Sequence, residues 1–189
     1  MSDQNSKPTV VVVDDNKSIA DLYSNQLADV YTIHTAYGGP EALETVDETV
    51  DVVLLDRRMP DLSGDEVLDR IRDEGYDCRV IMVTAVDPDF DIIDMAFDDY
   101  LCKPVDRETL LDAIDHQLTA KQYSETLDVL YQAKSKLALL EAEKSSEELE
   151  ESEEYQQLKQ RVAATQTQAE ELISELDDFE AAFTAIDRQ

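Results

Sequence analysis

The glycines and prolines of this chain are confined to its first 104 residues. All four glycines and all five prolines precede residue 105 of 189. These two residue types interrupt helices most strongly, since glycine is too flexible and proline lacks the amide hydrogen. The chain is therefore predicted to consist of a turn-rich N-terminal region and a C-terminal region that can form almost uninterrupted helix.

Short apolar runs alternate with amphipathic stretches in the N-terminal region. Four runs are apolar, often β-branched and bounded by polar residues, as strands buried on both faces are: residues 10–13, 52–55, 80–83 and 100–102. A fifth segment, residues 31–35, mixes polar and apolar residues as an edge strand does. Helical patterns cover about residues 17–28, 40–47, 63–74, 89–96 and 106–118. Five such alternations predict an α/β fold with a doubly wound, five-stranded parallel sheet.

Apolar side chains recur at heptad spacing in the C-terminal region. One seam is formed by Leu158, Val162, Thr165, Ala169, Leu172, Leu176, Phe179, Phe183 and Ile186. A weaker seam is formed by Tyr123, Leu127, Leu130, Lys134 and Leu137. The acidic segment 145–154 separates the two, with Ser152 as the expected cap of the second helix. A stripe this narrow needs a partner helix, so we expect a helical hairpin or coiled coil that pairs within one chain or between two chains of a homodimer.

The net charge of −29 is spread along the whole chain. Residues 1–120 carry 28 acids and 9 bases, and residues 121–189 carry 17 acids and 7 bases. Molar salt reduces the screening length to about 3 Å and removes such self-repulsion, which favours a halophilic source. No stripe of lysine and arginine is present to neutralise phosphates, so direct nucleic-acid binding is not expected.

The remaining composition predicts a cytoplasmic protein without membrane contact. The first 20 residues lack a signal-type pattern, and no uncharged apolar run reaches 18 residues. Cys78 and Cys102 lack the spacing of metal ligands, so both are predicted to be buried, reduced thiols.

A polar residue follows each of the four buried runs. Asp14 and Asp15 follow the first run, and Asp56, Thr84 and Lys103 follow the others. Because the carboxyl ends of parallel strands meet at one edge of a sheet, these five side chains are expected to lie together. Three clustered carboxylates need a cation, and their hard oxygen ligands suit Mg²⁺. A lysine and a hydroxyl opposite them would complete a trap for a phosphoryl group carried on a carboxylate.

The motifs around these residues closely resemble those of the response-regulator receiver family. The matching pieces are residues 13–16 (Val-Asp-Asp-Asn), 36–43, 56–64 (Asp-Arg-Arg-Met-Pro-Asp-Leu-Ser-Gly), 83–85 (Val-Thr-Ala) and 99–104 (Asp-Tyr-Leu-Cys-Lys-Pro). The resemblance covers about residues 8–120 and implies a flavodoxin-like sheet with strand order 2-1-3-4-5. It further implies a response regulator of a two-component phosphorelay, a phosphoacceptor signalling domain rather than an enzyme with a separate substrate.

The resemblance implies a role for each site residue. Asp56 would accept the phosphoryl group from a phosphohistidine on a sensor histidine kinase. Mg²⁺ would be held by Asp14, Asp15, Asp56 and the backbone carbonyl of Arg58. Lys103 would pair with the phosphoryl group across a Lys103–Pro104 bond that is usually cis in the family.

Thr84 and Tyr100 match the switch pair of the family, in which the hydroxyl moves to the phosphoryl group and the aromatic ring turns inward behind it. Two positions depart from the family pattern. Phe97 stands where a small residue is common. The Arg58 side chain would either place a cation at the mouth of the site and change the phosphoryl lifetime or be an exposed arginine of little effect, and we favour the second reading.

The C-terminal region resembles the HalX domain of haloarchaeal regulators through Leu-Leu-Glu-Ala-Glu-Lys at residues 139–144. The expected organisation is an N-terminal arm at residues 1–7, a receiver domain at 8–120 and a HalX-like coiled-coil domain at 121–189. Phosphorylation is expected to control the helical tail or a partner.

Two other classes of function fit part of the pattern. A phosphohydrolase with an aspartyl nucleophile usually carries a second aspartate two positions later, where this chain has Arg58. A receiver-like adaptor that is never phosphorylated would have no need to retain every group of the acceptor site. Both readings are therefore less favoured than a receiver.

Overall fold

A computed structural model describes residues 7–186, and the side chains through Phe179. The chain divides into two compact units, Met1–Leu118 and Thr119–Gln189. The boundary falls within helix α4 (Arg107–Glu143). Within the described residues, no helix is both long enough and apolar enough to cross a membrane.

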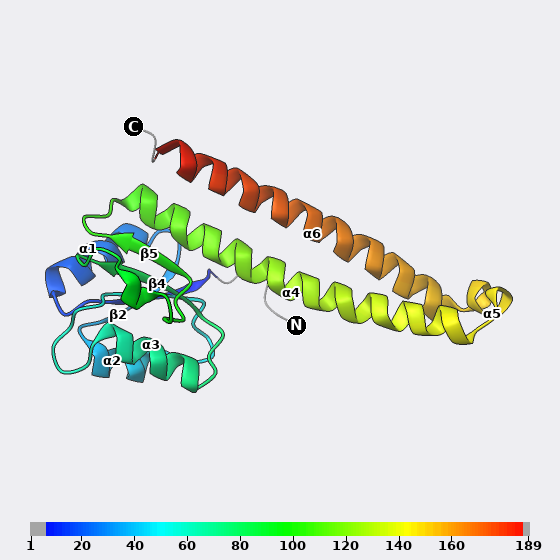
Figure 1. The fold of residues 1–189 in the computed structure, drawn as a ribbon, viewed down its shortest axis with the longest axis horizontal. Helices are drawn as coiled ribbons and strands as arrows, with labels where there is room; N and C mark the ends of the chain where they lie inside the picture. The colour runs from blue at the N-terminus through cyan, green and yellow to red at the C-terminus, as the bar shows by residue number, and fades with distance from the viewer. Residues whose placement is uncertain (1–6, 187–189) are drawn as a thin grey trace. The chain divides into compact units, whose positions relative to one another are not determined.

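Five parallel strands form the sheet of the first unit (Figure 1). They are β1 (Thr9–Val13), β2 (Thr32–Ala36), β3 (Val52–Leu55), β4 (Arg79–Thr84) and β5 (Asp99–Cys102). Their order is β2-β1-β3-β4-β5, and every neighbouring pair is parallel. This order confirms the predicted doubly wound sheet, with the mixed strand β2 at one edge.

Helices pack against both faces of this sheet. Helices α2 (Gly39–Thr45) and α3 (Gly64–Asp73) bury apolar side chains against Val11, Val53 and their neighbours on one face. Helix α1 (Lys17–Leu27) and the start of α4 cover the other face, where Val10 and Val52 lie. Alternate residues of the buried strands thus enter opposite apolar layers, which explains their continuous apolar runs.

Local capping places two helix starts close to the carboxyl ends of the strands. The Asn16 side chain accepts a hydrogen bond from the Ser18 amide and begins α1. Ser63 and Glu66 form a reciprocal capping box at the start of α3. Each side chain satisfies amide groups that the first turn of a helix leaves unpaired. The loops that leave β1 and β3 are therefore held in defined positions.

The helix predicted at residues 89–96 is wrong. The structure has only a short 3-10 helix, η1 (Phe90–Ile92), at this place. Residues 87–99 contain six aspartates and no lysine or arginine, and Pro88 precedes η1. A helix of two turns is marginal on its own, and repulsion between like charges lowers its stability further.

The second unit is a helical hairpin. The remainder of α4 packs against α6 (Glu153–Ile186), and the short helix α5 (Ser146–Glu151) connects them. The Tyr155 hydroxyl donates to Glu141 of α4 at 2.8 Å. Ser152 accepts the Tyr155 amide and caps α6 as predicted. The acidic segment predicted as a separator forms α5, because Ser145 and Glu148 make a capping box.

The seam predicted on α4 is wrong by one position at two places. Leu127 and Lys134 are exposed, whereas Thr126, Leu130 and Ala133 are buried. The structure keeps Leu130 on the seam but replaces Leu127 by Thr126 and Lys134 by Ala133, each one residue earlier than predicted. On α6 the predicted seam is at least partly buried from Leu158 to Phe179, and its last members, Phe183 and Ile186, lie outside the described side chains.

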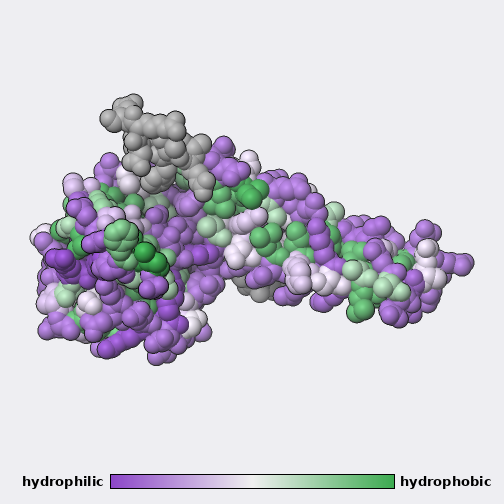
Figure 2. Space-filling view, in the orientation of Figure 1, coloured by the Kyte–Doolittle hydropathy of each residue, from purple (hydrophilic) through white to green (hydrophobic). Residues whose placement is uncertain are grey.

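The face of the molecule seen in Figure 2 is largely covered by hydrophilic residues. Among the side chains that the structure describes, three charged ones are buried: Asp14, Asp56 and Arg57. Cys78 is buried as predicted, but Cys102 is exposed, so the prediction for this thiol is wrong. Cys102 is the last residue of β5, at the edge of the sheet, which leaves its side chain open to solvent.

Candidate functional site

Three carboxylates meet at the carboxyl ends of β1 and β3. Asp14 and Asp15 follow β1, Asp56 follows β3, and one oxygen atom from each lies within 4.8 Å of the others. Asp14 and Asp56 are buried, and Asp15 is exposed. The backbone amide of Asn16 donates to Asp14 Oδ1 at 2.8 Å and fixes that carboxylate at the start of α1.

The ammonium group of Lys103, just after β5, lies against two of these carboxylates. Its Nζ donates to Asp14 Oδ2 at 2.5 Å and forms an ion pair with Asp56 Oδ1 at 3.3 Å. Burial acts to lower the pKa of Lys103, but the hydrogen bond to Asp14 and the charge of Asp56 prevail and raise it. The Lys103 side chain therefore stays protonated. The Lys103–Pro104 peptide bond is cis, as the family resemblance implied.

Burial raises the pKa of the Asp56 carboxyl above its ordinary value. The charge of Lys103 and a hydrogen bond from the Thr84 hydroxyl oppose this rise, whereas the charge of Asp14 adds to it. Three carboxylates and one ammonium leave two negative charges in a partly dry pocket. Such a group of oxygen ligands suits a divalent, hard cation of the Mg²⁺ type.

The loop after Asp56 is shaped by a close backbone approach. A Cβ on Gly64 would lie 2.2 Å from the carbonyl oxygen of Asp56, so only glycine fits there. The Gly64 amide donates to the Arg57 carbonyl at 2.9 Å. Asp61 completes the turn with a φ of 67°, a left-handed conformation that aspartate and asparagine tolerate. The start of α3 is thereby held directly against Asp56.

The side chains of Thr84 and Tyr100 both form hydrogen bonds with the backbone of Val86. The Val86 amide donates to Thr84 Oγ1 at 3.3 Å, and the Tyr100 hydroxyl donates to the Val86 carbonyl at 2.7 Å. The Tyr100 ring packs against Phe97, with ring centroids 5.6 Å apart. The two side chains predicted as a switch pair are thus linked through one residue of the loop after β4.

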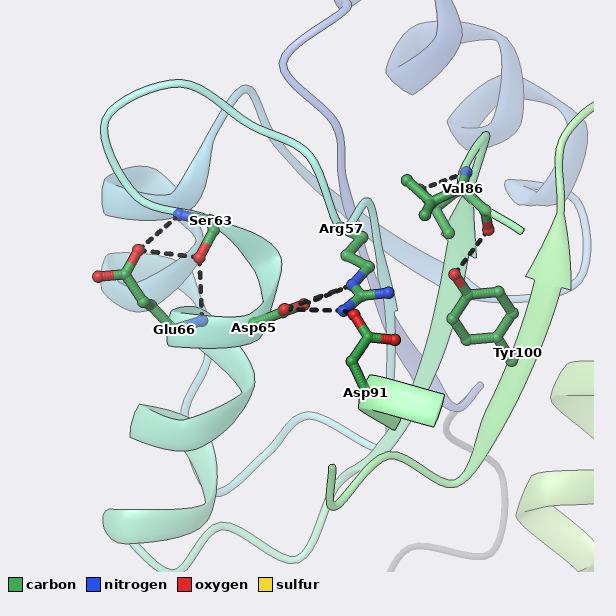
Figure 3. A network of polar contacts seen from close by, with 8 residues as sticks. Arg57, Ser63, Asp65, Glu66, Val86, Asp91 and Tyr100 are labelled. Atoms are coloured by element: carbon green, nitrogen blue, oxygen red, sulfur yellow. Dashed lines mark hydrogen bonds and ion pairs between the residues drawn. The ribbon is translucent and has the colours of Figure 1, made fainter. Parts of the chain in front are cut away.

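Arg57 is a buried charged residue that the sequence motifs did not indicate. Its guanidinium binds Asp65 in a bidentate manner, at 3.0 Å from Nε and 3.2 Å from Nη2 (Figure 3). Nη2 also pairs with Asp91 of η1 at 2.5 Å. The acid-rich and base-free stretch at residues 87–99 was the available signal that some nearby cation is needed. The side chain of Arg58, by contrast, is exposed.

The predicted site residues are therefore brought together on one edge of the sheet. Asp14, Asp15 and Asp56 form the acidic pocket, Lys103 bridges two of them, and the Thr84 hydroxyl reaches Asp56. Tyr100 does not contact the carboxylates directly but is linked to Thr84 through hydrogen bonds to Val86.

Comparison with known proteins assigns both parts of the chain. Residues 10–115 match the response regulator receiver domain family, and residues 119–183 match the HalX domain family. The chain belongs to the response regulator receiver family, and it carries a HalX domain after the receiver domain. Its acidic pocket is the Asp triad typical of a receiver Mg²⁺ site.

Curated relatives include regulators from an archaeon and a bacterium. The chain is 41% identical over 169 residues to a "Putative transcriptional regulator" of Haloferax volcanii, which covers 89% of the chain and 29% of the relative. It is 37% identical over 110 residues to the "Transcriptional regulatory protein DltR" of Streptococcus agalactiae, which covers 56% of the chain and 49% of that protein. The chain thus spans less than half the length of these relatives. The haloarchaeal relative agrees with the halophilic character inferred from the charge.

Solved receiver domains share the fold of the first unit. The beryllofluoride-activated receiver domain of DrrB, a Thermotoga maritima protein, superposes with a TM-score of 0.55 and 30% identity, over 59% of this chain and 97% of that chain. A CheY-like receiver from Methanospirillum hungatei gives a TM-score of 0.58 and 25% identity, over 62% of this chain and 98% of that chain.

Proposed function

We propose that Asp56 is the phosphoacceptor of a two-component phosphorelay. The observation that carries this proposal is the convergence of Lys103 on both Asp14 and Asp56 in a pocket of three carboxylates. An Asp56 oxygen would attack the phosphorus of a phosphohistidine on a sensor histidine kinase. The new P–O bond forms as the P–N bond breaks, and the imidazole keeps the electron pair and takes up a proton.

The residues of the pocket divide the remaining work. Asp14, Asp15 and Asp56, with the backbone carbonyl of Arg58, would hold Mg²⁺, whose charge draws in phosphoryl oxygens and offsets their repulsion from the carboxylates. Lys103 would neutralise a second phosphoryl oxygen, and the Thr84 hydroxyl would donate to a third. Tyr100 would follow Thr84 through their shared contact with Val86, as the switch partner.

We assign the receiver to residues 8–120 and the HalX-like domain to residues 121–189, with a short arm at residues 1–7, of which only Lys7 lies in the described part. We expect the protein to act in the cytoplasm, because a receiver domain needs access to a sensor kinase and to Mg²⁺. The acidic surface is unsuited to phosphate backbones, so we expect the output to pass through a protein partner rather than through direct DNA contact.

Acetyl phosphate with Mg²⁺ separates this proposal from its alternatives. A receiver gains one labile phosphate per chain, a phosphohydrolase turns acetyl phosphate over without retaining phosphate, and an adaptor does neither. Asp56→Asn should abolish incorporation, because the amide is not a competent nucleophile. Asp61→Asn is the matched control, since asparagine tolerates the positive φ at that exposed position. Incorporation that survives Asp56→Asn would refute the assignment.

The helical tail is the proposed output element. Helix α4 belongs to both units, and its packing with α6 provides a seam that can pair within one chain or between two. We propose that phosphorylation changes pairing or exposure of the seam at residues 158–186. Sedimentation in high salt, with and without beryllofluoride, tests this. A mass and shape that stay unchanged would count against it.

A further inference from the structure

Arg57 is the one buried charged residue, among those described, that has no role in the phosphoryl pocket. Its side chain is 10% exposed, although it follows Asp56 directly in sequence. A buried guanidinium is stable only when carboxylates pair with it. Arg57 obtains two such partners, from different parts of the chain.

The two partners lie on elements that surround the acceptor. Asp65 is in the first turn of α3 and holds the guanidinium through two nitrogen atoms. Asp91 lies in η1, in the connection between β4 and β5, and shares the Nη2 atom. Figure 3 shows the guanidinium between these two carboxylates.

The connection between β4 and β5, residues 85–98, packs Met95 and Phe97 near its end against the apolar core, whereas its centre has few apolar contacts. Phe90 is 86% exposed and Ile93 is 72% exposed, so apolar burial does little to fix its centre. Its end is held by Asp98, which pairs with Arg72 and Arg79 at 2.7 Å each. Its centre is tied by the Arg57–Asp91 pair. Repulsion among the aspartates of this connection makes a cation at its centre all the more necessary.

The two residues proposed as a switch pair, Thr84 and Tyr100, lie at opposite ends of this connection. Thr84 precedes it, and Tyr100 follows it. The Tyr100 hydroxyl bonds to the Val86 carbonyl, at the start of the connection. A movement of Thr84 toward a phosphoryl group would therefore shift residues 85 and 86, and with them the connection, while Arg57 holds its centre beside the acceptor.

We propose that Arg57 is a positioning residue that ties the centre of the connection at residues 85–98 to the loop of the phosphoacceptor through Asp91. The pair couples the position of η1 to the state of Asp56, in addition to the coupling through Thr84 and Tyr100. This inference rests on the proposed function, because it takes Asp56 as the acceptor.

Hydrogen–deuterium exchange of the full chain in high salt tests the role of the pair. Asp91→Asn should speed amide exchange of the peptide covering residues 85–98 by at least about threefold. The change that beryllofluoride and Mg²⁺ produce in that peptide should become smaller. Phosphate incorporation from acetyl phosphate should stay at one per chain. Asp94→Asn removes an equal charge from the same connection and should behave as the parent, because the structure gives Asp94 no part in the Arg57 network.

A double-mutant comparison assigns the effect to the pair. Arg57→Lys keeps the charge but loses the planar fork that binds two carboxylates, so it should resemble Asp91→Asn. Arg57→Lys combined with Asp91→Asn should add little to either single change. Unchanged far-UV circular dichroism in all variants excludes general unfolding.

The outcomes separate this role from the proposed function. A chain that accepts phosphate yet shows equal exchange in Asp91→Asn and Asp94→Asn would overturn the role of Arg57 alone. Fully additive effects of Arg57→Lys and Asp91→Asn would do the same. A parent chain that neither accepts phosphate nor responds to beryllofluoride would overturn the proposed function, and the coupling role with it.

Discussion

At the scale of single residues, the stability of the site depends on how its buried charges are compensated. Asp14 and Asp56 share the ammonium of Lys103, and Arg57 lies between Asp65 and Asp91. Each of these buried groups is costly alone and acceptable in its pair. The excess negative charge left beside Lys103 favours the binding of a divalent cation.

Removal of the Lys103 ammonium should expose this balance. Lys103→Met leaves Asp14 and Asp56 without their cation and should lower the free energy of unfolding by about 3 kcal/mol in magnesium-free buffer. Added Mg²⁺ should restore part of that loss, because it supplies the missing positive charge. Denaturant unfolding with and without Mg²⁺ measures both effects.

The control for this prediction is Lys17→Met, which removes an exposed ammonium near the same edge of the sheet. We expect a change below about 1 kcal/mol, from the loss of its cation–π contact with Tyr37, and no dependence on Mg²⁺. An equal loss in both variants would mean that Lys103 does not compensate the carboxylates.

The site could be predicted from sequence to the extent that its residues stand at strand ends. Asp14, Asp56, Thr84 and Lys103 follow buried runs, and a parallel sheet must bring such positions to one edge. The burial of Arg57 could not be predicted from sequence, because its partner Asp91 lies 34 positions away and only the fold makes them neighbours. Sequence spacing also could not distinguish the buried Arg57 from the exposed Arg58.

At the scale of elements, strands were predicted more reliably than the helices that lack a core to cover. The buried runs of β1, β3 and β4 lie at the predicted places, because only a sheet covered on both faces accommodates them. The predicted helix at 89–96 is replaced by η1, since a tertiary ion pair with Arg57 holds Asp91 and a second set of ion pairs holds Asp98, just beyond the predicted helix, in another conformation. Propensity alone could not reveal those pairs.

The junction between β3 and α3 should be intolerant of a single methyl group. Gly64→Ala places a Cβ 2.2 Å from the Asp56 carbonyl oxygen, so the loop must move. We expect a loss of at least about 2 kcal/mol in stability and a slower incorporation of phosphate from acetyl phosphate. Unfolding and phosphate incorporation measured on one preparation test both.

Gly75→Ala serves as the comparison for Gly64→Ala. Gly75 ends α3 with a φ of 78° and has open space around it, so alanine there should cost about 1 kcal/mol through backbone strain only. Phosphate incorporation should be unchanged. A Gly64→Ala variant with normal kinetics would show that this loop does not position Asp56.

The tail offers a matched pair of leucines on one helix. Leu130 is 8% exposed and Leu127 is 40% exposed, although the sequence placed both on the seam. Leu130→Ala should therefore lower the stability of the tail by about 2 to 3 kcal/mol, and Leu127→Ala by less than about 1 kcal/mol. Thermal unfolding followed by circular dichroism distinguishes them. Equal losses in the two variants would favour the seam predicted from sequence, which contains both leucines.

At the scale of the whole molecule, charge is the dominant physical feature. The chain carries a net charge of −29, and almost all of its described charged side chains lie at the surface, which is largely hydrophilic in the view of Figure 2. Such a surface repels itself at low ionic strength and is screened within about 3 Å in molar salt. The sequence predicted this behaviour directly, because it depends on composition rather than on fold.

Stability should therefore rise with salt. Between about 0.1 M and about 3 M KCl, the midpoint of thermal unfolding should increase by at least about 10 °C. Sucrose at matched osmolality is the control, since it favours the compact state without screening charge. A chain that is equally stable in low salt, or that gains as much from sucrose, would contradict a halophilic adaptation.

The central claim is that Asp56 carries the phosphoryl group. Borohydride reduces an aspartyl phosphate to homoserine, so treatment of the chain after acetyl phosphate and Mg²⁺ marks the acceptor permanently. Peptide mapping by mass spectrometry should find homoserine at position 56 and at no other aspartate, and only when Mg²⁺ is present. Homoserine at another position, or an unmodified Asp56 in a chain that has gained phosphate, would contradict the account.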